Sequence, residues 1–292
     1  MNRKAPQSAA LELGRGRVGG YAVLLAIVAM ILTACSSKPS DSDLMLVLTG
    51  SSTVAPIAAE LAARFEKANP GIRIDVQSGG SSRGIADARS GLAAIGMVSR
   101  SLKPNEGDLK VVTIGRDGVA LIAHESNPVD GLKKEDVIAL YRGEVADWSR
   151  LGGGSGGEGK PVVVHKADGR ATLEVFLGYF GIDPREVVAD VIVGENEQAI
   201  KTTSGNPHSV AYVSIGSASV NISKGAPIKL LSIDGVSASL STLREGKYPI
   251  SRPLNFVLKK EPTGLAADFI AFVQSEEARD VFAAQSFVQV AP

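Results

Sequence analysis

The sequence predicts an α/β fold with parallel-rich sheets flanked by helices, and three observations point to it. Residues 44–49 (LMLVLT) are an unbroken apolar run, as expected for a strand that is buried on both faces. Ile57, Leu61 and Phe65 follow at helical spacing, so the next segment is expected to form a helix with one buried stripe. The alternation of strand and helix recurs along the chain, and such repeated units favour a parallel sheet covered by helices.

The remaining elements follow in order from their patterns. The first helix holds Pro56 in its first turn, where a missing N–H breaks no helical bond, and it ends at residues 69–71 (NPG). Apolar or alternating runs predict further strands, and amphipathic segments predict helices. The expected strands are 72–77, 93–99, 110–115, 118–124, 161–165, 209–215, 228–233 and 248–260, and the expected helices are 83–92, 132–143, 173–180 and two short ones within 264–285.

The first 43 residues have a different character. Basic residues precede an apolar stretch, 21–32, which is too short to span a bilayer but typical of a secretion signal. The stretch ends in LTAC, and small residues before a cysteine at this depth resemble the lipobox of bacterial lipoproteins. The resemblance implies a signal peptide over 1–34, a lipid on Cys35 and a polar tether over 35–43, so that the exported protein is anchored to a bacterial membrane and faces the periplasm or the cell exterior. An ordinary signal peptide with a chance cysteine is the alternative.

Composition excludes several classes of function. Lys and Arg together number 31, as do Asp and Glu, so the formal net charge is zero and no nucleic-acid partner is expected. Cys35 is the only cysteine. If it carries lipid, the mature chain has no thiol nucleophile, no disulfide and no cysteine-based metal site.

Three expected strand-to-helix turns share one chemistry. They are residues 50–53 (GSST), 79–83 (GGSSR) and 166–172 (KADGRAT), and each places glycine, hydroxyls or cations at the start of a helix. The carboxyl ends of parallel strands meet at one edge of a sheet, where ligands bind. Helix N-termini carry unpaired N–H groups and partial positive charge, so the three turns predict a site for a small anion. Serine and threonine are also ordinary helix caps, which is the alternative for each turn taken alone.

The sequence gives little support for catalysis. Ser52 or Ser81 could act as a nucleophile only with a base within hydrogen-bond reach. The histidines are His124, His165 and His208, and only His165 falls beside the predicted site, where a neutral loop side chain is the simpler interpretation. Neither a GxSxG elbow nor an HExxH motif occurs, and no turn matches a nucleotide-binding loop. We therefore expect a binding protein that is not an enzyme and that holds no metal or cofactor.

Several blocks of the chain resemble a known family. The block GSSTVAPIAAELAARFEKANPGIRIDVQSGGSSRGIADARSGLAAIGMVSRSL, with SVAYVSIG and DGVSASLSTLREGKYPISRPLNFVLKK further on, is similar to the phosphate-binding proteins of ABC transporters, in the periplasmic-binding-protein superfamily. The resemblance covers nearly all of 45–292. It implies a two-lobed type II fold that closes on inorganic phosphate and delivers it to ABC permease subunits. Lobe one would comprise 45–123 and 228–292, and lobe two 124–227.

The resemblance also implies ligand-binding residues. The ligands of the first two turns fall on Ser52, Thr53 and Ser81. The loop of lobe two is usually basic-x-acid-Gly-Ser-Gly-Thr, and Lys166, Asp168, Gly169 and Thr172 match it, whereas Arg170 and Ala171 replace the usual Ser and Gly. Arg170 would then be a forked donor to the anion. The alternatives are a surface pair between Arg170 and Glu174 and a turn ion pair between Lys166 and Asp168.

A second departure bears on the choice of anion. Some family members have an aspartate at the end of the third strand that accepts the proton of hydrogen phosphate, and here Ser99-Arg100 occupies that place. Arginine cannot accept a hydrogen bond, although Arg100 could still contact the anion as a donor. Phosphate stays the expected ligand, with sulfate, molybdate and phosphonates left open. A sensing lipoprotein that signals to a membrane kinase is an alternative to a transport role, and a phosphate-ester hydrolase is a further one.

Overall fold

The computed structural model describes residues 44–152 and 157–290. The expected signal peptide, Cys35 and the tether lie outside these residues, so lipidation of Cys35 remains a prediction. In the part of the chain that is described, no helix is both long and apolar enough to cross a membrane.

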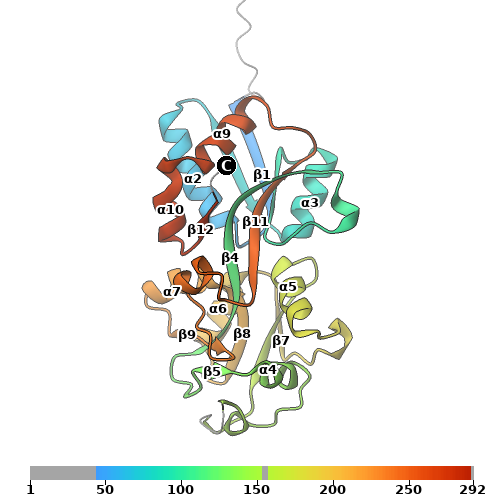
Figure 1. The fold of residues 1–292 in the computed structure, drawn as a ribbon, viewed down its shortest axis with the longest axis vertical. Coiled ribbons are helices and arrows are strands. Elements are labelled where there is room, and N and C mark those ends of the chain that lie inside the picture. Colours follow the sequence, from blue (N-terminus) through green and yellow to red (C-terminus); the bar gives the residue numbers. More distant parts are fainter. Residues whose placement is uncertain (1–43, 153–156, 291–292) are drawn as a thin grey trace, which may run out of the picture. The chain divides into compact units, whose positions relative to one another are not determined.

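Lobe one is an α/β layer in which three parallel strands alternate with helices (Figure 1). Its sheet has the order β2-β1-β3-β11-β4. The strands that open the chain are β1 (Met45–Gly50), β2 (Arg73–Ser78) and β3 (Ile95–Val98), and the helices after the first two are α2 (Ala55–Ala68) and α3 (Ser81–Ser90). Both strand partners of β1 run parallel to it, as the repeated strand–helix units predicted.

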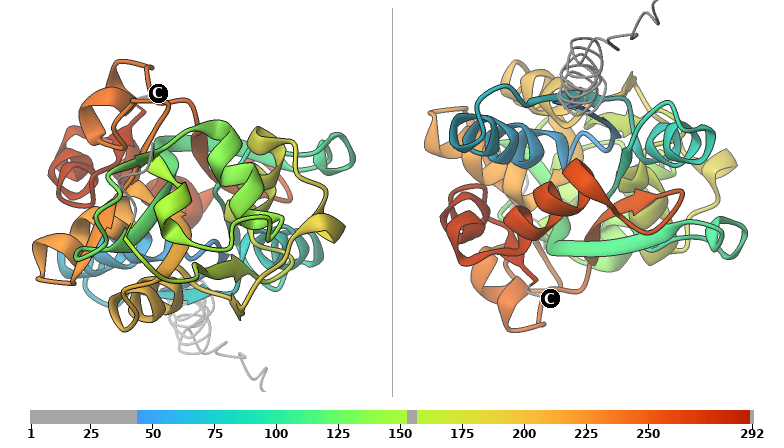
Figure 2. Two further views of the ribbon diagram at one scale, coloured as in Figure 1. Left: turned by 90° about the horizontal axis from the view of Figure 1, so that it is seen from below. Right: turned by 90° about the horizontal axis from the view of Figure 1, so that it is seen from above.

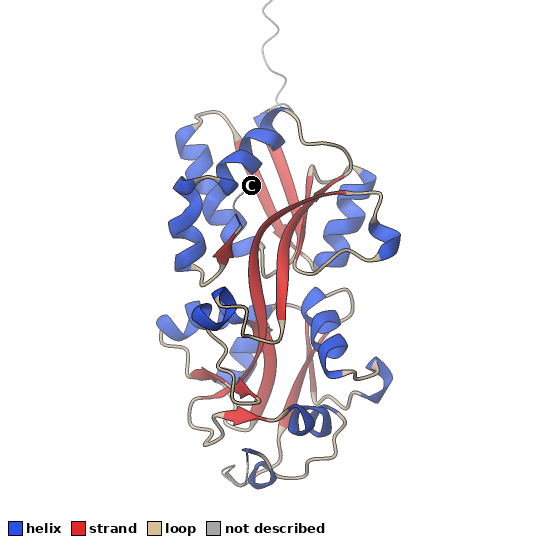
Figure 3. Cartoon of the chain, in the orientation of Figure 1, coloured by secondary structure: helices blue, strands red, loops and turns tan. Residues whose placement is uncertain are grey.

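Two strands connect the lobes (Figure 3). Strand β4 (Lys110–His124) is 15 residues long, and β11 (Ser251–Leu258) runs antiparallel to its first half. The second half of β4 pairs with β8 of lobe two. The prediction of separate strands at 110–115 and 118–124 is therefore wrong, because one continuous strand serves both sheets.

Lobe two repeats the α/β layering. Its sheet continues from β4 in the order β8-β6-β7, and β6 lies parallel to both of its neighbours. Helices cover it on both sides. The strands are β5 (Gly131–Leu132), β6 (Val162–Lys166), β7 (Val191–Val193), β8 (Ser209–Ser214), β9 (Ile228–Leu230) and β10 (Ser232–Ile233), and the helices are α4 (Lys134–Tyr141), α5 (Ala171–Phe180), α6 (Asn196–Ser204), α7 (Ile215–Ser223) and α8 (Leu240–Arg244).

The C-terminal segment returns to lobe one (Figure 2). Helices α9 (Gly264–Gln274) and α10 (Arg279–Ala284) pack against α2, and the short strand β12 (Val288–Gln289) pairs with β4. Short 3₁₀ turns at 104–106, 148–150, 184–186 and 276–278 complete the described elements.

Two large hydrophobic cores define the lobes. Ile57, Leu61 and Phe65 are buried in the core of lobe one, which confirms the predicted stripe of α2. The main core of lobe two extends from Val119 to Ile250. The crossovers therefore lie near residues 118 and 251, and not at the expected boundaries of 123/124 and 227/228. The difference arises because the second half of β4 and the segment after β9 pack into lobe two.

Candidate anion-binding site

The three polar turns meet at one small cavity between the lobes. The cavity has a volume of about 10 Å³, which is far below the roughly 300–1,000 Å³ of pockets for drug-sized ligands. Both lobes contribute to its wall. The lining residues are Ser51, Ser52, Gly80, Ser81, Ser99, Lys166, Arg170, Ala171, Thr172, Gly194 and Asn196.

Two helices begin at the cavity with uncapped N-termini. No side chain in the described residues caps α3, which follows Gly80, or α5, which follows Arg170. Ser81 and Thr172 lie inside the first turns of these helices and do not serve as their caps. The free N–H groups and the two helix dipoles therefore make the cavity favourable for an anion.

The two lobes touch beside the cavity. The Ser82 amide of α3 donates to the Gly169 carbonyl of the lobe-two loop at 3.2 Å. Gly80 has φ +94°, and a Cβ placed there would lie 2.8 Å from the Gly169 oxygen. A side chain at position 80 would thus be strained and would hold the lobes apart. This arrangement is the closed form expected for a protein that encloses its ligand.

Arg252 of β11 organises the centre of the site. It is 2% exposed, and its Nε and Nη2 both donate to Asp117 of β4, at 3.1 and 2.8 Å. Its other hydrogen bonds reach three hydroxyls, those of Thr53 at 2.9 Å, Thr172 at 2.9 Å and Ser99 at 3.4 Å. All five N–H groups of this guanidinium are therefore used within the protein.

The three hydroxyls become donors as a result. Each oxygen accepts a hydrogen from Arg252, so each keeps its own hydrogen to donate elsewhere. Ser81 is in the same position, since its Oγ accepts from the Ser99 amide at 3.1 Å. Thr53 and Ser99 belong to lobe one and Thr172 to lobe two, so this network also ties the closed lobes together.

Lys166 supplies a buried cation. It is 3% exposed, and its Nζ donates to the Glu195 carbonyl at 2.7 Å. The pKa of Lys166 is lowered to about 7, chiefly by burial; Glu195 opposes this shift, and the neighbouring cations Arg252 and Arg170 contribute to it. The suggested pairing with Asp168 is replaced by this contact with the start of α6. An anion in the cavity would favour the charged form of Lys166.

Arg170 lines the cavity, but its partner differs from the alternative raised by the sequence. Its Nη1 pairs with Glu195 at 2.5 Å, while Glu174 pairs with Lys103 at 2.7 Å and with Arg100 at 3.2 Å. The alternative of an Arg170–Glu174 pair is wrong, because Glu174 faces lobe one across the closed interface. The two pairs made by Glu174 join lobe one to α5 and favour the closed form.

Arg100 is not a residue of the cavity wall. Its Nη1 and Nη2 bind the two carboxylate oxygens of Glu106, at 2.7 and 2.9 Å, and this pair is buried. The guanidinium thus points toward Glu106 and Glu174, and the expectation that Arg100 contacts the anion is not supported. Its neighbour Ser99 is the residue of this strand end that lines the cavity.

His165 is bonded in the interior of lobe two. Its Nδ1 lies 2.9 Å from the Tyr212 hydroxyl, and burial lowers its pKa, so the ring is neutral near pH 7. The Tyr212 oxygen also accepts from the Lys166 amide at 3.2 Å. His165 supports the strand that carries Lys166, and its ring is bonded to neither Ser52 nor Ser81 in the described structure.

Other members of the site escaped sequence reasoning. Arg252 lies within the block SRPL, and Asp117 is a charged residue inside an apolar strand pattern; both were signals of a buried polar contact. Asn196 opens α6 after β7, so the segment 194–196 is a fourth strand-to-helix turn. Each of these residues takes its place in the site through a partner that is distant in the sequence, as Arg252 does through its hydrogen bond to Asp117.

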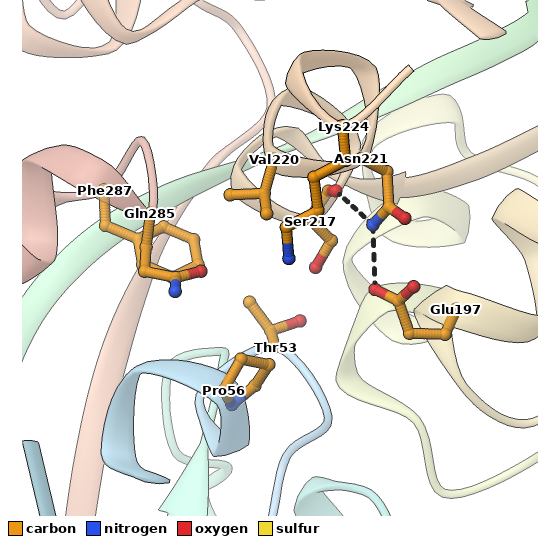
Figure 4. Close-up of a pocket in the computed structure, with 9 residues that line it drawn as sticks. All are labelled: Thr53, Pro56, Glu197, Ser217, Val220, Asn221, Lys224, Gln285 and Phe287. Atoms are coloured by element: carbon orange, nitrogen blue, oxygen red, sulfur yellow. Dashed lines mark hydrogen bonds between the residues drawn. The ribbon is translucent and has the colours of Figure 1, made fainter. Parts of the chain in front are cut away.

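A second cavity adjoins the first on the other side of Thr53. In Figure 4, Thr53 and Pro56 at the start of α2 lie opposite Ser217 and Val220 of α7. This second cavity has a polar lining, in which the Asn221 side-chain amide donates to the Glu197 carboxylate at 3.0 Å.

Comparison with known proteins agrees with this geometry. Residues 33–277 match the family model of the PBP superfamily domain. The chain therefore belongs to the periplasmic-binding-protein superfamily, and within it to the phosphate-binding proteins of ABC transporters. The phosphate-binding protein PstS of Bacillus subtilis is 28% identical over 272 residues, which cover 87% of this chain and 88% of that protein.

Solved structures show the same likeness. A structure from Clostridium perfringens, described as a phosphate ABC transporter substrate-binding protein with bound phosphate, aligns with a TM-score of 0.78 and 31% identity, covering 84% of this chain and 99% of that one. An ABC-type phosphate transport receptor from Vibrio cholerae aligns with a TM-score of 0.66 and 26% identity, covering 83% and 99%. The predicted α/β two-lobed fold is thereby confirmed.

Proposed function

We propose that this protein binds inorganic phosphate between its two lobes and delivers it to an ABC importer. The observation that carries the proposal is the closed cavity in which two uncapped helix N-termini, several donor hydroxyls and the buried Lys166 converge. The bound phosphate in the similar Clostridium perfringens structure supports the choice of ligand.

The charge balance of the site suits a small anion. Arg252 is neutralised by Asp117, and Arg170 is paired with Glu195, so Lys166 is the lining cation without a carboxylate partner in the described residues. Removing an anion from water costs several kcal/mol unless donors replace its hydration. The cavity supplies those donors from N–H groups, hydroxyls and cations. Ser52, Ser81, Lys166, Arg170, Ala171 and Thr172 of the expected ligand set line it, and Thr53 adjoins it.

Export and anchoring form the second part of the proposal. The LTAC sequence at Cys35, after an apolar stretch of signal-peptide length, supports a lipoprotein that is anchored to a bacterial membrane and faces the periplasm or the cell exterior. A tethered receptor of this kind would remain close to permease subunits in the same membrane.

A ligand screen tests the binding function. The purified protein is heated with phosphate, sulfate, molybdate, tungstate or a phosphonate, and its melting temperature is recorded. Phosphate at a hundredfold excess over its dissociation constant is expected to stabilise the protein by about 2.7 kcal/mol. Stabilisation by another of these anions alone would replace phosphate as the ligand, and no shift with any of them would remove the proposed function.

A further inference from the structure

We propose that one end of lobe one rests on the membrane that holds the lipid anchor, and that it recognises the anionic headgroups of that membrane. This end is where the parallel strands of lobe one begin, and it is the end seen from above in Figure 2 (right). We call it the tether-side face and define it by Met45, Lys67, Arg73, Leu92, Lys259 and Lys260. The inference rests on the proposed lipid anchor at Cys35 and does not depend on which anion the cavity binds.

Strand pairing brings these residues to one edge of the sheet. Met45 and Arg73 lie opposite each other at the start of the parallel pair β1–β2, and β3 also runs parallel to β1. Gly91, which ends α3 ahead of β3, shares a shallow hollow of about 320 Å³ with Lys259 and Lys260, which follow β11. The tether-side face is therefore a continuous surface at the amino ends of the parallel strands.

Two large apolar side chains of this face are exposed to solvent. Leu92 is 75% exposed and Met45 is 51% exposed. Leu92 follows Gly91, the left-handed residue that ends α3, and an apolar residue at that position commonly packs back onto the helix end. Its exposure shows that Leu92 does not cover α3 in this way, so its side chain is free to contact another surface.

Exposed cations surround these apolar side chains. Four basic residues of the face are exposed and form no ion pair among residues 44–152 and 157–290, namely Lys67, Arg73, Lys259 and Lys260. Two other cations at this end are neutralised, because Arg89 pairs with Asp108 and Lys110 pairs with Glu261. Glu66 and Asp268 are the nearby carboxylates that pair with no cation in the described structure. The face therefore carries an excess of positive charge.

The tether holds this face near the membrane. Eight residues, 36–43, separate Cys35 from Leu44, which directly precedes β1. A fully extended chain spans roughly 3.3–3.6 Å per residue, so Leu44 stays within roughly 30 Å of the acylated cysteine. With one lysine and two aspartates, the tether itself is not attracted to an anionic surface. The attraction must then come from the cations of the face.

A weak attraction is sufficient in a tethered protein. A basic residue near an anionic bilayer strengthens the association roughly fivefold. The anchor makes the contact intramolecular, so a few such residues can keep the face on the membrane although the same surface would bind little from solution. Leu92 and Met45 add apolar contact at the level of the headgroups.

This contact leaves the anion cavity undisturbed. The six residues of β1 separate Met45 from Ser51, which lines the cavity, and a strand of that length spans roughly 20 Å. The Debye length is roughly 8 Å at physiological ionic strength, so the negative potential of the membrane is largely screened at the cavity.

A patch on lobe two provides a matched comparison. Val188 and Ile192 are 57% and 68% exposed, which is similar to the tether-side face. The nearby cations differ, because Arg142, Lys160 and Arg185 each pair with a carboxylate. This patch belongs to lobe two, whereas the tether joins lobe one, so it is not expected to contact the membrane.

Quenching by spin-labelled lipids tests the contact. The lipidated protein has no free thiol, because Cys35 is the only cysteine, so Leu92→Cys or Ile192→Cys accepts a fluorescent label at one position. Each labelled protein is reconstituted through its anchor into vesicles of phosphatidylcholine, with or without phosphatidylglycerol, that contain a lipid with a nitroxide on its headgroup. Phosphatidylglycerol should raise the quenching at position 92 several-fold and leave position 192 unchanged. At 1 M salt, where the Debye length is about 3 Å, the rise should disappear.

Two pairs of substitutions separate charge from proximity. Lys259→Gln with Lys260→Gln should lower the ratio of contacting to free protein by roughly 25-fold. Lys133→Gln with Lys224→Gln changes two exposed lysines of lobe two and should leave the ratio unchanged. Both double variants should keep the phosphate affinity of the wild type, which confirms that they fold. A label on Met45→Cys repeats the measurement if the label at position 92 disturbs the protein.

The outcomes separate this inference from the proposed function. If the protein does not float with vesicles, Cys35 carries no lipid, and the proposed anchor fails together with this inference. If the protein floats but phosphatidylglycerol does not raise the quenching at position 92, the anchor stands and the contact is refuted. A rise that survives Lys259→Gln with Lys260→Gln would also refute it.

Discussion

Replacing Lys166 with methionine removes the one lining cation that has no carboxylate partner in the described site. Burial lowers the pKa of Lys166 from 10.5 to about 7. At 1.36 kcal/mol per pKa unit, that difference corresponds to roughly 5 kcal/mol for charging the buried amine without a ligand. An anion in the cavity offsets this cost by raising the pKa again, so binding above pH 7 should take up a proton.

The lowered pKa of Lys166 also makes the stability of the folded protein depend on pH. In the unfolded chain Lys166 stays protonated up to about pH 10.4, whereas in the empty folded protein it loses its proton near pH 7. Between these values the unfolded state binds more protons, so the free energy of unfolding rises with pH by up to about 1.4 kcal/mol per unit. Lys166→Met should lack this rise and should be more stable than the wild type at and below pH 7.

Titration calorimetry at pH 8, in buffers with different enthalpies of ionisation, measures how many protons the protein takes up when it binds phosphate. Wild type should take up close to one proton per phosphate, and Lys166→Met close to none, with weaker binding. Lys224→Met, which alters an exposed lysine directly after α7, should behave as wild type. Equal proton uptake by wild type and Lys166→Met would refute the reasoning.

Three further predictions concern other parts of the account. Arg170→Ala should weaken phosphate binding by about 10- to 150-fold in calorimetric titration if Arg170 donates to the anion, and by less than about threefold if it only pairs with Glu195. Arg252→Met should destabilise the protein by about 3–5 kcal/mol in denaturant unfolding, because Asp117 is left buried and unpaired. Adding Asp117→Leu should restore stability but not phosphate affinity. Recovery of both would contradict the role of Arg252 in orienting the hydroxyls of the site. Cys35→Ala should fail to incorporate labelled palmitate in cells, whereas labelling equal to that of wild type would refute the lipobox interpretation.

Local patterns in the sequence predicted the features that depend on neighbouring residues. The buried stripe of α2 and the turns at 50–53, 79–83 and 166–172 follow from spacing and residue type within a single turn or helix. The meeting of the first two turns also followed, because the carboxyl ends of parallel strands share an edge. The third turn belongs to lobe two, and only the resemblance to two-lobed binding proteins implied that it would join them.

Contacts between distant residues could not be predicted in this way. Arg100 was expected at the anion because of its position after β3, yet Glu106 and Glu174 hold it. Arg252 and Asp117 face each other only because β4 and β11 pair across the crossover. The lobe boundary differs from the expected one for a similar reason, since the sequence does not reveal that β4 is long enough to belong to two sheets.

Phosphate is expected to lie in the cavity between the lobes. A crystal structure of the protein grown with phosphate measures this directly. We expect one phosphate within hydrogen-bond distance of Lys166 Nζ and the Ser81 and Thr172 hydroxyls, with the two lobes closed as described. A cavity that remains without phosphate at concentrations that stabilise the protein in solution, or phosphate bound only elsewhere, would contradict the account.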